Sequence, residues 1–485
     1  MVAYYSSALD GVAANPALPT PLLLRLISFE GGDDRRPFES LHRAMIRPGL
    51  PESAIAAVRA HPIAHVRSAF ATSGQAEPEQ RALLVDDPSP KVRAAVAIGP
   101  EWTLDHRTKV RPLPDAACER LLADPELSVR KSVLHSDNVA PSFLASLAGH
   151  PDPAARRAAL RVWDELTADE HAALLADPDP EVRRRAEVCA CPQDAKLTTA
   201  LFADPASLRE ALRRGRLDRA EAEQLLTKGV HLADLAANPS LPPDLVDRLA
   251  VDPDHDVRLA VSLRPELTEA RRAAIDVTVE AWARVDVDWV GAGTADQDVL
   301  RRAVTSAHPL LRRAAARSPH LSPDLLRLLA EDTDFEVHRL LAVCHPDTPV
   351  EVLMGVYAKL GGTFSAWMAT GHPNFPREGL AHYADHPDPI YRHLVVRDPA
   401  ATPDLIERLS HDPDTWTRQS AARDPRLPLP RLIEALTEPE LAYCAGANPA
   451  LPPDEMAGVM DRAGVPSGKG EGEGLGTTGA PAQSP

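Results

Sequence analysis

The sequence predicts an all-helical solenoid, an array of short helix pairs stacked one on another. The main observation is an internal repeat, since residues 238–261 (NPSLPPDLVDRLAVDPDHDVRLAV) match residues 398–421 (DPAATPDLIERLSHDPDTWTRQSA) at ten positions. Self-similarity with a period between about 20 and 50 residues is typical of repeat arrays. A second observation is that we find no alternating apolar runs bounded by hairpin turns, the pattern that would predict strands.

Each unit is expected to contain two helices. In the first, Pro243 stands at a helix start, where its missing N–H has no consequence, and Leu245 and Leu249 fall one turn apart on one face. This helix should end at Asp252, because the residue before a proline is disfavoured in helical conformation. Asp254 should cap the second helix, whose small residues allow close approach of neighbouring units. The same cap is expected at Ser89, Asp152, Asp179 and Asp388.

A Val-Arg element in the second helix sets the period. It recurs, with Ala or Leu in place of Val in two units, at Val66, Val92, Val129, Ala155, Val182, Leu208 and Val257. Most intervals are 26 or 27 residues, and an insertion near 99–111 and a degenerate unit near 229–235 explain the longer ones. The period predicts about 16 units within one array, residues 1–462. Residues 463–485, rich in Gly, Pro and Ser, are predicted to form a disordered tail.

An aspartate and an arginine six residues apart recur through the array. The pairs are Asp87/Arg93, Asp124/Arg130, Asp177/Arg183, Asp252/Arg258 and Asp412/Arg418, with histidine replacing aspartate in His61/Arg67, His150/Arg156 and His386/Arg392. Identical positions line up in a stacked array, so we expect a ladder of charge-assisted hydrogen bonds from one unit's arginine to its neighbour's aspartate. A neutral histidine can also accept a hydrogen bond. We interpret the pairs as scaffold, and expect Asp252→Ala to destabilise the protein more than Asp247→Ala.

Composition narrows the classes of partner. The formal net charge is −17, so the average field repels nucleic-acid phosphates and anionic lipids. The N-terminal residues show no signal-peptide pattern, and no run approaches the roughly 18 apolar residues of a membrane span. These observations predict a soluble, cytoplasmic protein without a membrane partner.

The units at 238–261, 318–343 and 398–421 resemble leucine-rich repeat variant units, a helical family similar in style to HEAT repeats. The resemblance covers most of residues 15–462 and weakens near 28–47, 98–112, 210–235, 276–298 and 355–371. It implies a right-handed superhelix in which some turns are tighter than an α-helix. The family's described member carries an iron–sulfur cluster in a cysteine-bearing N-terminal segment. The first cysteine here is Cys118, so the cluster is not expected.

The sequence indicates no catalytic, cofactor-binding or metal-binding residue. Cys189 and Cys191 form the one close cysteine pair, but no second pair stands at zinc-site spacing, and small buried residues explain them better. His382 and His386 would share a helix face, yet spacing specifies no third ligand. No phosphate loop, nucleophile elbow or zinc-protease motif occurs. We therefore expect a protein that is not an enzyme.

Three function classes were weighed. A scaffold that binds an unidentified protein partner on an extended surface is favoured. A nucleic-acid-binding array would use the basic stretch from Arg209 to Arg219, although no aromatic residue interleaves its arginines. A HEAT-like lyase or another enzyme is the third class. Four tryptophans in the weak segments are either partner contacts or fillers of gaps between irregular units. They are Trp102, Trp282, Trp289 and Trp367.

Overall fold

The structure is a computed structural model that describes residues 8–28, 49–74, 76–100, 111–291, 295–361 and 369–466. Over these ranges every regular element is a helix, which confirms the all-α class. The chain divides into two compact units, one of residues 1–96 with 378–485 and one of residues 97–377. None of the described helices combines the length and apolarity that crossing a membrane requires. Most of the predicted tail, from residue 467 on, lies outside the described residues.

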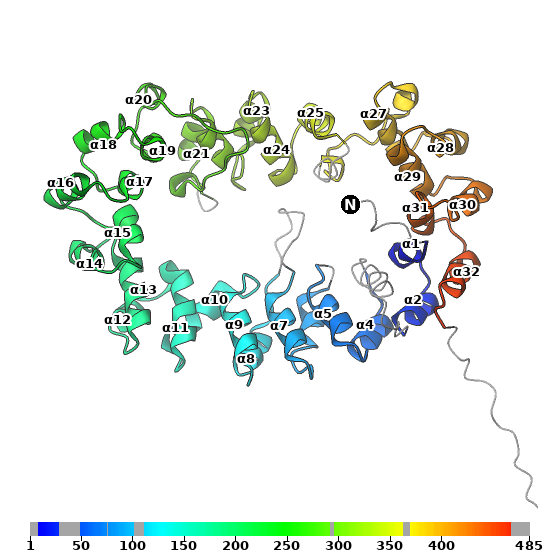
Figure 1. Cartoon of the computed structure of the whole chain (residues 1–485), viewed down its shortest axis with the longest axis horizontal. Helices are drawn as coiled ribbons and strands as arrows, with labels where there is room; N and C mark the ends of the chain where they lie inside the picture. Colours follow the sequence, from blue (N-terminus) through cyan, green and yellow to red (C-terminus); the bar gives the residue numbers. More distant parts are fainter. Residues whose placement is uncertain are drawn as a thin grey trace, which may run out of the picture. The chain divides into compact units, whose positions relative to one another are not determined.

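The helices are short and follow one another in pairs (Figure 1). In the unit that contains both chain ends they are α1 (Ala8–Ala14), α2 (Thr20–Ile27), α4 (Glu52–Arg59), α5 (Ala64–Ala71), α6 (Pro78–Ala82), α7 (Pro90–Ile98, which ends at the unit's edge), η5 (Ala381–Asp385), α27 (Pro389–Leu394), η6 (Val395–Arg397), α28 (Pro403–Leu409), α29 (Thr415–Arg423), α30 (Leu429–Ala435), α31 (Ala442–Gly446) and α32 (Pro453–Arg462).

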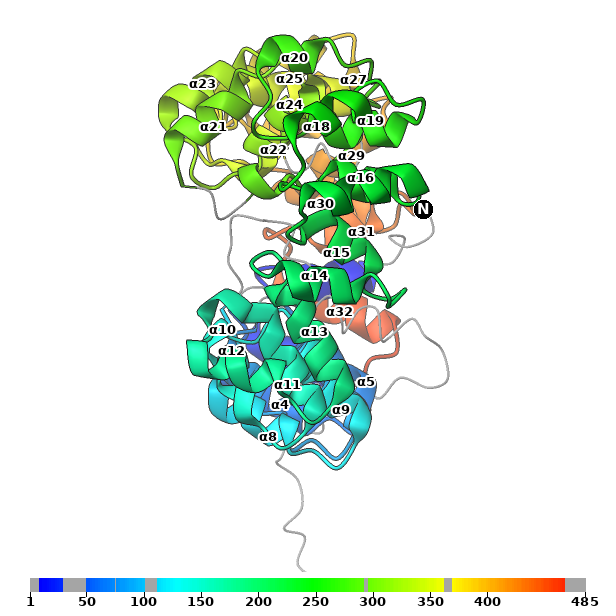
Figure 2. The ribbon, with the colours of Figure 1, turned by 90° about the vertical axis from the view of Figure 1, so that its left-hand side faces the viewer.

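The other unit shows the same succession, which is visible from α11 to α15 in Figure 2. Its helices are α8 (Asp115–Leu122), α9 (Leu127–His135), α10 (Pro141–Ser146), η2 (Leu147–Gly149), α11 (Pro153–Ala159), η3 (Leu160–Glu165), α12 (Ala168–Leu175), α13 (Pro180–Ala190), α14 (Ala195–Leu201), α15 (Leu208–Arg214), α16 (Arg219–Lys228), α17 (Leu232–Ala236), α18 (Pro243–Leu249), α19 (His255–Ser262), α20 (Glu269–Ala273), η4 (Asp288–Val290), α21 (Gln297–Val304), α22 (Pro309–Ala315), α23 (Pro323–Ala330), α24 (Phe335–Cys344) and α25 (Val350–Leu360).

The pair α18 and α19 shows how the sequence directs each helix pair. Helix α18 begins at Pro243 as predicted, and Leu245 and Leu249 are both buried on its inner face. The carboxylate of Asp254 accepts a hydrogen bond from the amide of Asp256 and so caps α19. The equivalent caps at Asp152, Asp179 and Asp388 are also present. Proline and aspartate therefore place the helix starts, because proline suits the first turn and aspartate satisfies its free amides. The end of α18 differs from the prediction: the helix stops at Leu249, three residues before Asp252.

The predicted ladder is present in part: nine arginines share one backbone contact, and four of them also bind an aspartate of the following unit. The Nη1 atom of each donates to the backbone carbonyl six residues earlier, in Arg67, Arg93, Arg130, Arg156, Arg183, Arg258, Arg312, Arg392 and Arg418. In four repeats the Nε and Nη2 atoms of the arginine also donate to the carboxylate of the aspartate in the following repeat. The pairs are Arg67–Asp87, Arg156–Asp177, Arg312–Asp332 and Arg392–Asp412. In these four units the arginine joins its helix both to the preceding turn of its own unit and to the next unit.

Asp252 departs from the predicted ladder. Its carboxylate accepts a hydrogen bond from the amide of Asp254 at 2.9 Å, and the described residues place no arginine on it. The physical reason is that the preceding helix α17 has Leu232 and no arginine at the position from which the fork would come. Asp247 instead forms an ion pair with Arg271. The expectation that Asp252 anchors the array more strongly than Asp247 therefore loses its basis.

A second set of side chains satisfies the carbonyl groups at the ends of the second helices. Asn238 Nδ2 donates to the carbonyls of Leu212 and Gly215 at 2.7 and 2.8 Å. Asn448 Nδ2 makes the equivalent two hydrogen bonds to the repeat before its own, at the carbonyls of Ala422 and Asp424. The last carbonyls of a helix have no partner within it, so these asparagines join neighbouring units through groups that would otherwise stay unsatisfied.

The first repeat of the chain packs on the last repeat in the same way, through an asparagine side chain that binds two carbonyls. Asn15 Nδ2 donates to the carbonyls of Gly446 and Asn448 at 2.9 and 2.7 Å, across 431 and 433 residues of sequence. Figure 1 shows α1 beside α31, and the two helices contact each other. They cross at Gly11 and Gly446, where an added Cβ on Gly446 would lie 2.5 Å from the carbonyl oxygen of Ala8. The N-terminal helices therefore continue the C-terminal stack.

Candidate functional site

One segment interrupts the helix pairs, and we call residues 276–290 the crossing segment. After α20 the chain does not form the second helix that the repeat predicts but runs as irregular chain to the short helix η4. Polar and apolar residues alternate through DVTVEAWARVDV, residues 276–287. The even-numbered side chains are exposed, and the odd-numbered ones, apart from Ala281, are at least half-buried. This is the pattern of an extended chain that lies with one face against a surface.

The first part of the crossing segment is held by α19. Arg258 Nε donates to the carbonyl of Asp276 at 2.7 Å, and the ring of His255 lies 3.0 Å from the carbonyl of Thr278. Val277 packs against the apolar cluster that α18 and α19 share. Arg258 is a ladder arginine, so a residue type that elsewhere binds an aspartate side chain here binds the backbone of an extended chain.

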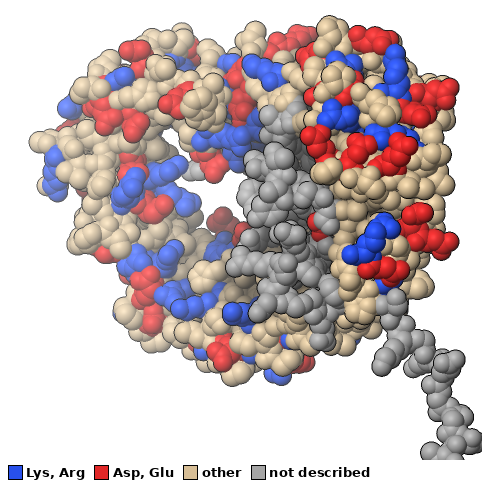
Figure 3. All heavy atoms as spheres, turned by 45° about the vertical axis from the view of Figure 1, so that its right-hand side comes forward, with Lys and Arg blue, Asp and Glu red and all other residues tan. Residues whose placement is uncertain are grey.

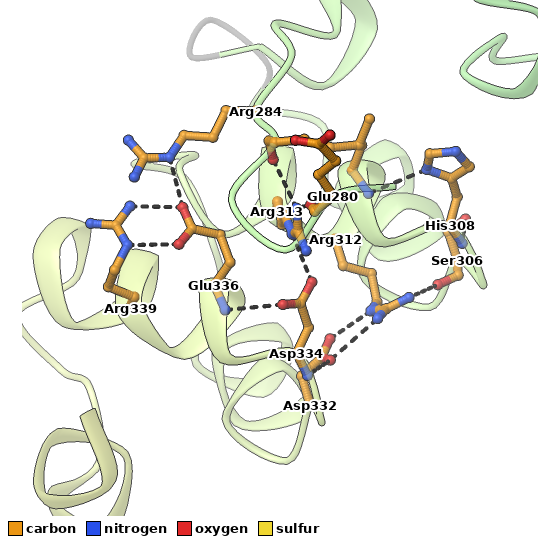
Figure 4. A network of polar contacts seen from close by, with 12 residues as sticks. Glu280, Arg284, Ser306, His308, Arg312, Arg313, Asp332, Asp334, Glu336 and Arg339 are labelled. Carbon is orange, nitrogen blue, oxygen red and sulfur yellow. Dashed lines mark hydrogen bonds and ion pairs between the residues drawn. The ribbon is translucent and has the colours of Figure 1, made fainter. Parts of the chain in front are cut away.

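The middle of the crossing segment is held by α22 and α24 (Figure 4). Arg313 Nη1 donates to the carbonyls of Glu280 and Ala283 at 2.9 and 2.8 Å. Its Nε binds Asp334, the N-cap of α24, at 2.7 Å, which orients the guanidinium. Arg284 of the segment then reaches Glu336 on α24, with 2.6 Å between Nε and Oε1. The two carbonyls that Arg313 binds belong to a turn, because the amide of Ala283 donates to the carbonyl of Glu280 at 3.0 Å. The helices α19, α22 and α24 thus contact the crossing segment through its carbonyls and one side chain.

Glu336 is the buried centre of this network. Its side chain is 6% exposed and accepts hydrogen bonds from Arg339 at 2.7 and 2.8 Å as well as from Arg284. Burial raises the pKa of this carboxyl, but the hydrogen bonds from Arg339 and Arg284 outweigh burial and hold the pKa below its ordinary value. The carboxylate is therefore charged at neutral pH and carries two guanidinium groups, one from the helix and one from the segment.

His308 lies at the start of α22 in the same region. Its Nδ1 accepts from the amide of Leu310, and its Nε2 lies 3.1 Å from Ser262 Oγ. Burial, followed by the positive field of Arg272, lowers the pKa of His308 to about 4. The ring is therefore neutral at pH 7 and acts as a helix cap.

The tryptophans of the weak segments divide between the two interpretations. Trp289 is half-buried against the cluster of α21 to α24 and donates to the carbonyl of Leu263 at 2.8 Å, so it fills a gap between irregular units. Trp282, on the crossing segment, is 74% exposed and is available for contact. Trp102 and Trp367 lie outside the described residues.

The basic stretch from Arg209 to Arg219 lies on α15 and the start of α16. Arg209 and Arg219 form ion pairs with Asp234 and Asp244, each at 2.7 Å. The other three arginines, Arg213, Arg214 and Arg216, are exposed. Figure 3 shows acidic and basic side chains side by side over much of the face that it presents. Nearby carboxylates therefore offset part of the positive charge that phosphate binding would need.

The cysteine and histidine pairs show no arrangement typical of a metal site. Cys191 is buried and Cys189 half-buried, and burial raises the pKa of both thiols. His382 and His386 do not share an α-helical face, because the 3-10 helix η5 ends at Asp385, between them. Within the described ranges, no three His, Cys, Asp or Glu side chains are grouped as metal ligands are.

Sequence reasoning treated residues 276–298 only as a weak repeat and missed the crossing segment. The signal that reveals it is the alternation from Asp276 to Val287, interrupted only by Trp282, which has the period of an extended chain and stands within a helical repeat. The partners of the segment could not be predicted, because Arg313 and Glu336 stand at repeat positions that vary in residue type.

Comparisons with known proteins assign no family to this chain. Neither the family models nor the curated proteins contain a match. Among solved structures, the crystal structure of an engineered protein from the Northeast Structural Genomics Consortium aligns over 83% of this chain and 96% of its own length, at 15% identity and a TM-score of 0.13. A TM-score this low assigns neither a fold nor a function.

Proposed function

We propose that this protein is a non-enzymatic helical-repeat scaffold that binds a protein partner in extended conformation on its second helices. The observation that carries the proposal is the crossing segment. Side chains at repeat positions on α19, α22 and α24 hold fifteen residues of irregular chain without enclosing them in the apolar core, apart from the last few. A surface that binds an irregular stretch of its own chain by backbone carbonyls suits an extended or turned stretch of another protein.

The proposal agrees with the chemistry of the described residues. The arginines that hold the segment contact main-chain carbonyls, which every polypeptide presents, while Glu336 adds a selective contact to one arginine. Main-chain contacts of this kind supply affinity and side-chain contacts supply specificity. The leucine-rich repeat variant resemblance and the solenoid form belong to this proposal as its structural part.

The test is purification of the tagged full-length protein from its host's lysate, with and without nuclease, followed by hydrogen exchange on the isolated complex. We expect a stoichiometric protein that survives nuclease and slows amide exchange on second helices. Recovery that depends on intact nucleic acid would contradict the proposal. It would instead support the nucleic-acid alternative, for which the exposed Arg213, Arg214 and Arg216 are the side chains to mutate. Protection confined to first helices would show that a different surface binds the partner.

A further inference from the structure

The network that holds the crossing segment has a duplicate in the same compact unit, on α11 and α13. The ladder pair Arg312–Asp332 joins α22 to the turn before α24, and Arg156–Asp177 joins α11 to the turn before α13. With these pairs aligned, the neighbouring positions correspond one to one. Arg313 corresponds to Arg157, Asp334 to Asp179, Glu336 to Glu181, and Arg339 to Arg184.

The duplicate shares the helix cap and the glutamate–arginine fork of the first network. Among the described residues, the ion pair of Arg313 with Asp334 has no counterpart between Arg157 and Asp179. Asp179 caps α13 by accepting from the amides of Glu181 and Val182, as Asp334 caps α24. Glu181 binds Arg184 three residues later at 2.5 and 2.9 Å, matching the Glu336–Arg339 fork. The helices α11 and α13 contact each other, as α22 and α24 do. One arginine and one glutamate are therefore presented from adjacent second helices in both places.

The two networks differ in exposure. Glu336 is 6% exposed and Arg313 is buried, because the crossing segment lies over them and supplies Arg284 and two carbonyls. At α11 and α13 the Glu181 side chain is 39% exposed, and Arg157 is exposed. The side chains that bind an extended chain in one pair of units are thus available to solvent in the other.

We propose that α11 and α13 bind a segment of a protein partner in which a turn directly precedes an arginine, with Glu181 receiving that arginine and Arg157 donating to two carbonyls of the turn. The spacing follows from the crossing segment, in which Arg313 binds the carbonyls of Glu280 and Ala283, four and one residues before Arg284. This proposal rests on the proposed function and names the surface and the chemistry of the partner.

The carboxylate of Glu181 is the group at this place that would recognise a basic residue. Glu336 accepts from two guanidinium groups at once, whereas Glu181 is paired with Arg184 and has the Nε of the exposed Arg185 at 3.8 Å. That second contact is longer than a hydrogen bond, so an incoming guanidinium can displace it. A planar guanidinium matches a carboxylate better than an ammonium does. Because Arg157, Arg184 and Arg185 all act on Glu181, a nucleic acid is the competing ligand that the test must include.

The test uses a fluorescein-labelled peptide with the sequence of residues 276–290, titrated with the full-length protein and followed by fluorescence anisotropy. We expect Arg157→Glu and Glu181→Arg each to weaken binding at least about tenfold, as loss of a charge-assisted contact does. Arg248→Glu changes an exposed arginine on the first helix α18 and serves as the matched control, with affinity unchanged. Circular dichroism melts verify that each variant is folded.

A charge swap makes the assignment specific. A peptide with glutamate in place of the arginine that corresponds to Arg284 should bind wild-type protein weakly, and Glu181→Arg should restore its binding to within about threefold. Peptide affinity that is unchanged in both Arg157→Glu and Glu181→Arg would overturn this site, while the pull-down described above would still decide the scaffold function. A 20-nucleotide single strand that binds more tightly than the peptide and depends on Arg157 would overturn the choice of partner.

Discussion

Replacing Asp177 by alanine tests the ladder most directly. Asp177 is 3% exposed, and its carboxylate binds Arg156 Nε and Nη2 at 2.6 and 2.7 Å and the amide of Asp179 at 2.8 Å. The substitution removes these bonds and leaves the guanidinium with the carbonyls of His150 and Pro151. Removing one partner of a buried ion pair costs about 3–5 kcal/mol. Because Arg156 keeps two acceptors, we expect about 3 kcal/mol.

Thermal unfolding followed by circular dichroism measures this effect. For a compact unit of this size, about 3 kcal/mol corresponds to a fall in Tm of about 6 °C. Asp169→Ala, an exposed aspartate on the neighbouring helix α12, is the matched control and should change stability by less than about 0.5 kcal/mol. Asp252→Ala loses one side-chain hydrogen bond and should cost about 1 kcal/mol. Equal Tm values for Asp177→Ala and Asp252→Ala would refute the ladder as a source of stability.

The pH dependence of this difference has a definite sign. The hydrogen bond from Arg156 holds the pKa of Asp177 below its ordinary value. A depressed pKa contributes stability above the unfolded pKa of about 3.9, and this stability is lost as the pH falls through the lower folded pKa. The Tm difference between wild type and Asp177→Ala should stay constant from about pH 7 to pH 5 and narrow below about pH 4.

Three other predictions follow from buried groups and close packing. His308 has a folded pKa of about 4, so the stability that it contributes above the ordinary histidine pKa is lost as the pH falls toward 4. In that pH range, His308→Asn should reduce the change of unfolding free energy with pH, measured by urea unfolding, by about 1.4 kcal/mol per pH unit. Gly446→Val should force α1 from α31 and speed amide exchange in α1, whereas Gly458→Ala, which meets only a flexible side chain, should not. Burial raises the pKa of Cys118 to about 12 and of Cys191 to about 11, so both thiols should react with a disulfide reagent at pH 8 far more slowly in the folded protein than in guanidinium.

Much of the local structure could be predicted because it depends on neighbouring residues. Pro243 begins a helix, Asp254 caps the next one, and Leu245 and Leu249 share a buried face through interactions within a few residues. The ladder could also be predicted, since identical positions in successive units meet. Where the repeat lost its arginine, at Leu232, the prediction for Asp252 failed because the missing partner belonged to another unit.

The candidate site could be predicted only in part. The alternation from Asp276 to Val287 can be seen in the sequence, but which helices the segment contacts cannot be predicted from it. Arg313 and Glu336 become a binding pair because α22 and α24 pack together and the crossing segment runs over both. The same residue types at Arg157 and Glu181 remain exposed, a difference that no local pattern encodes.

The sequence alone determined the helical class, the starts of the helices and the register of the repeat, because capping, proline geometry and apolar periodicity act over a few residues. The tertiary structure alone decided that the N-terminal helices complete the C-terminal stack, through Asn15 and the Gly11–Gly446 crossing. It also decided that the crossing segment is held by three second helices. The physical reason is that these contacts join groups far apart in the chain. Their energy comes from burial and from carbonyls that only a neighbouring unit can satisfy.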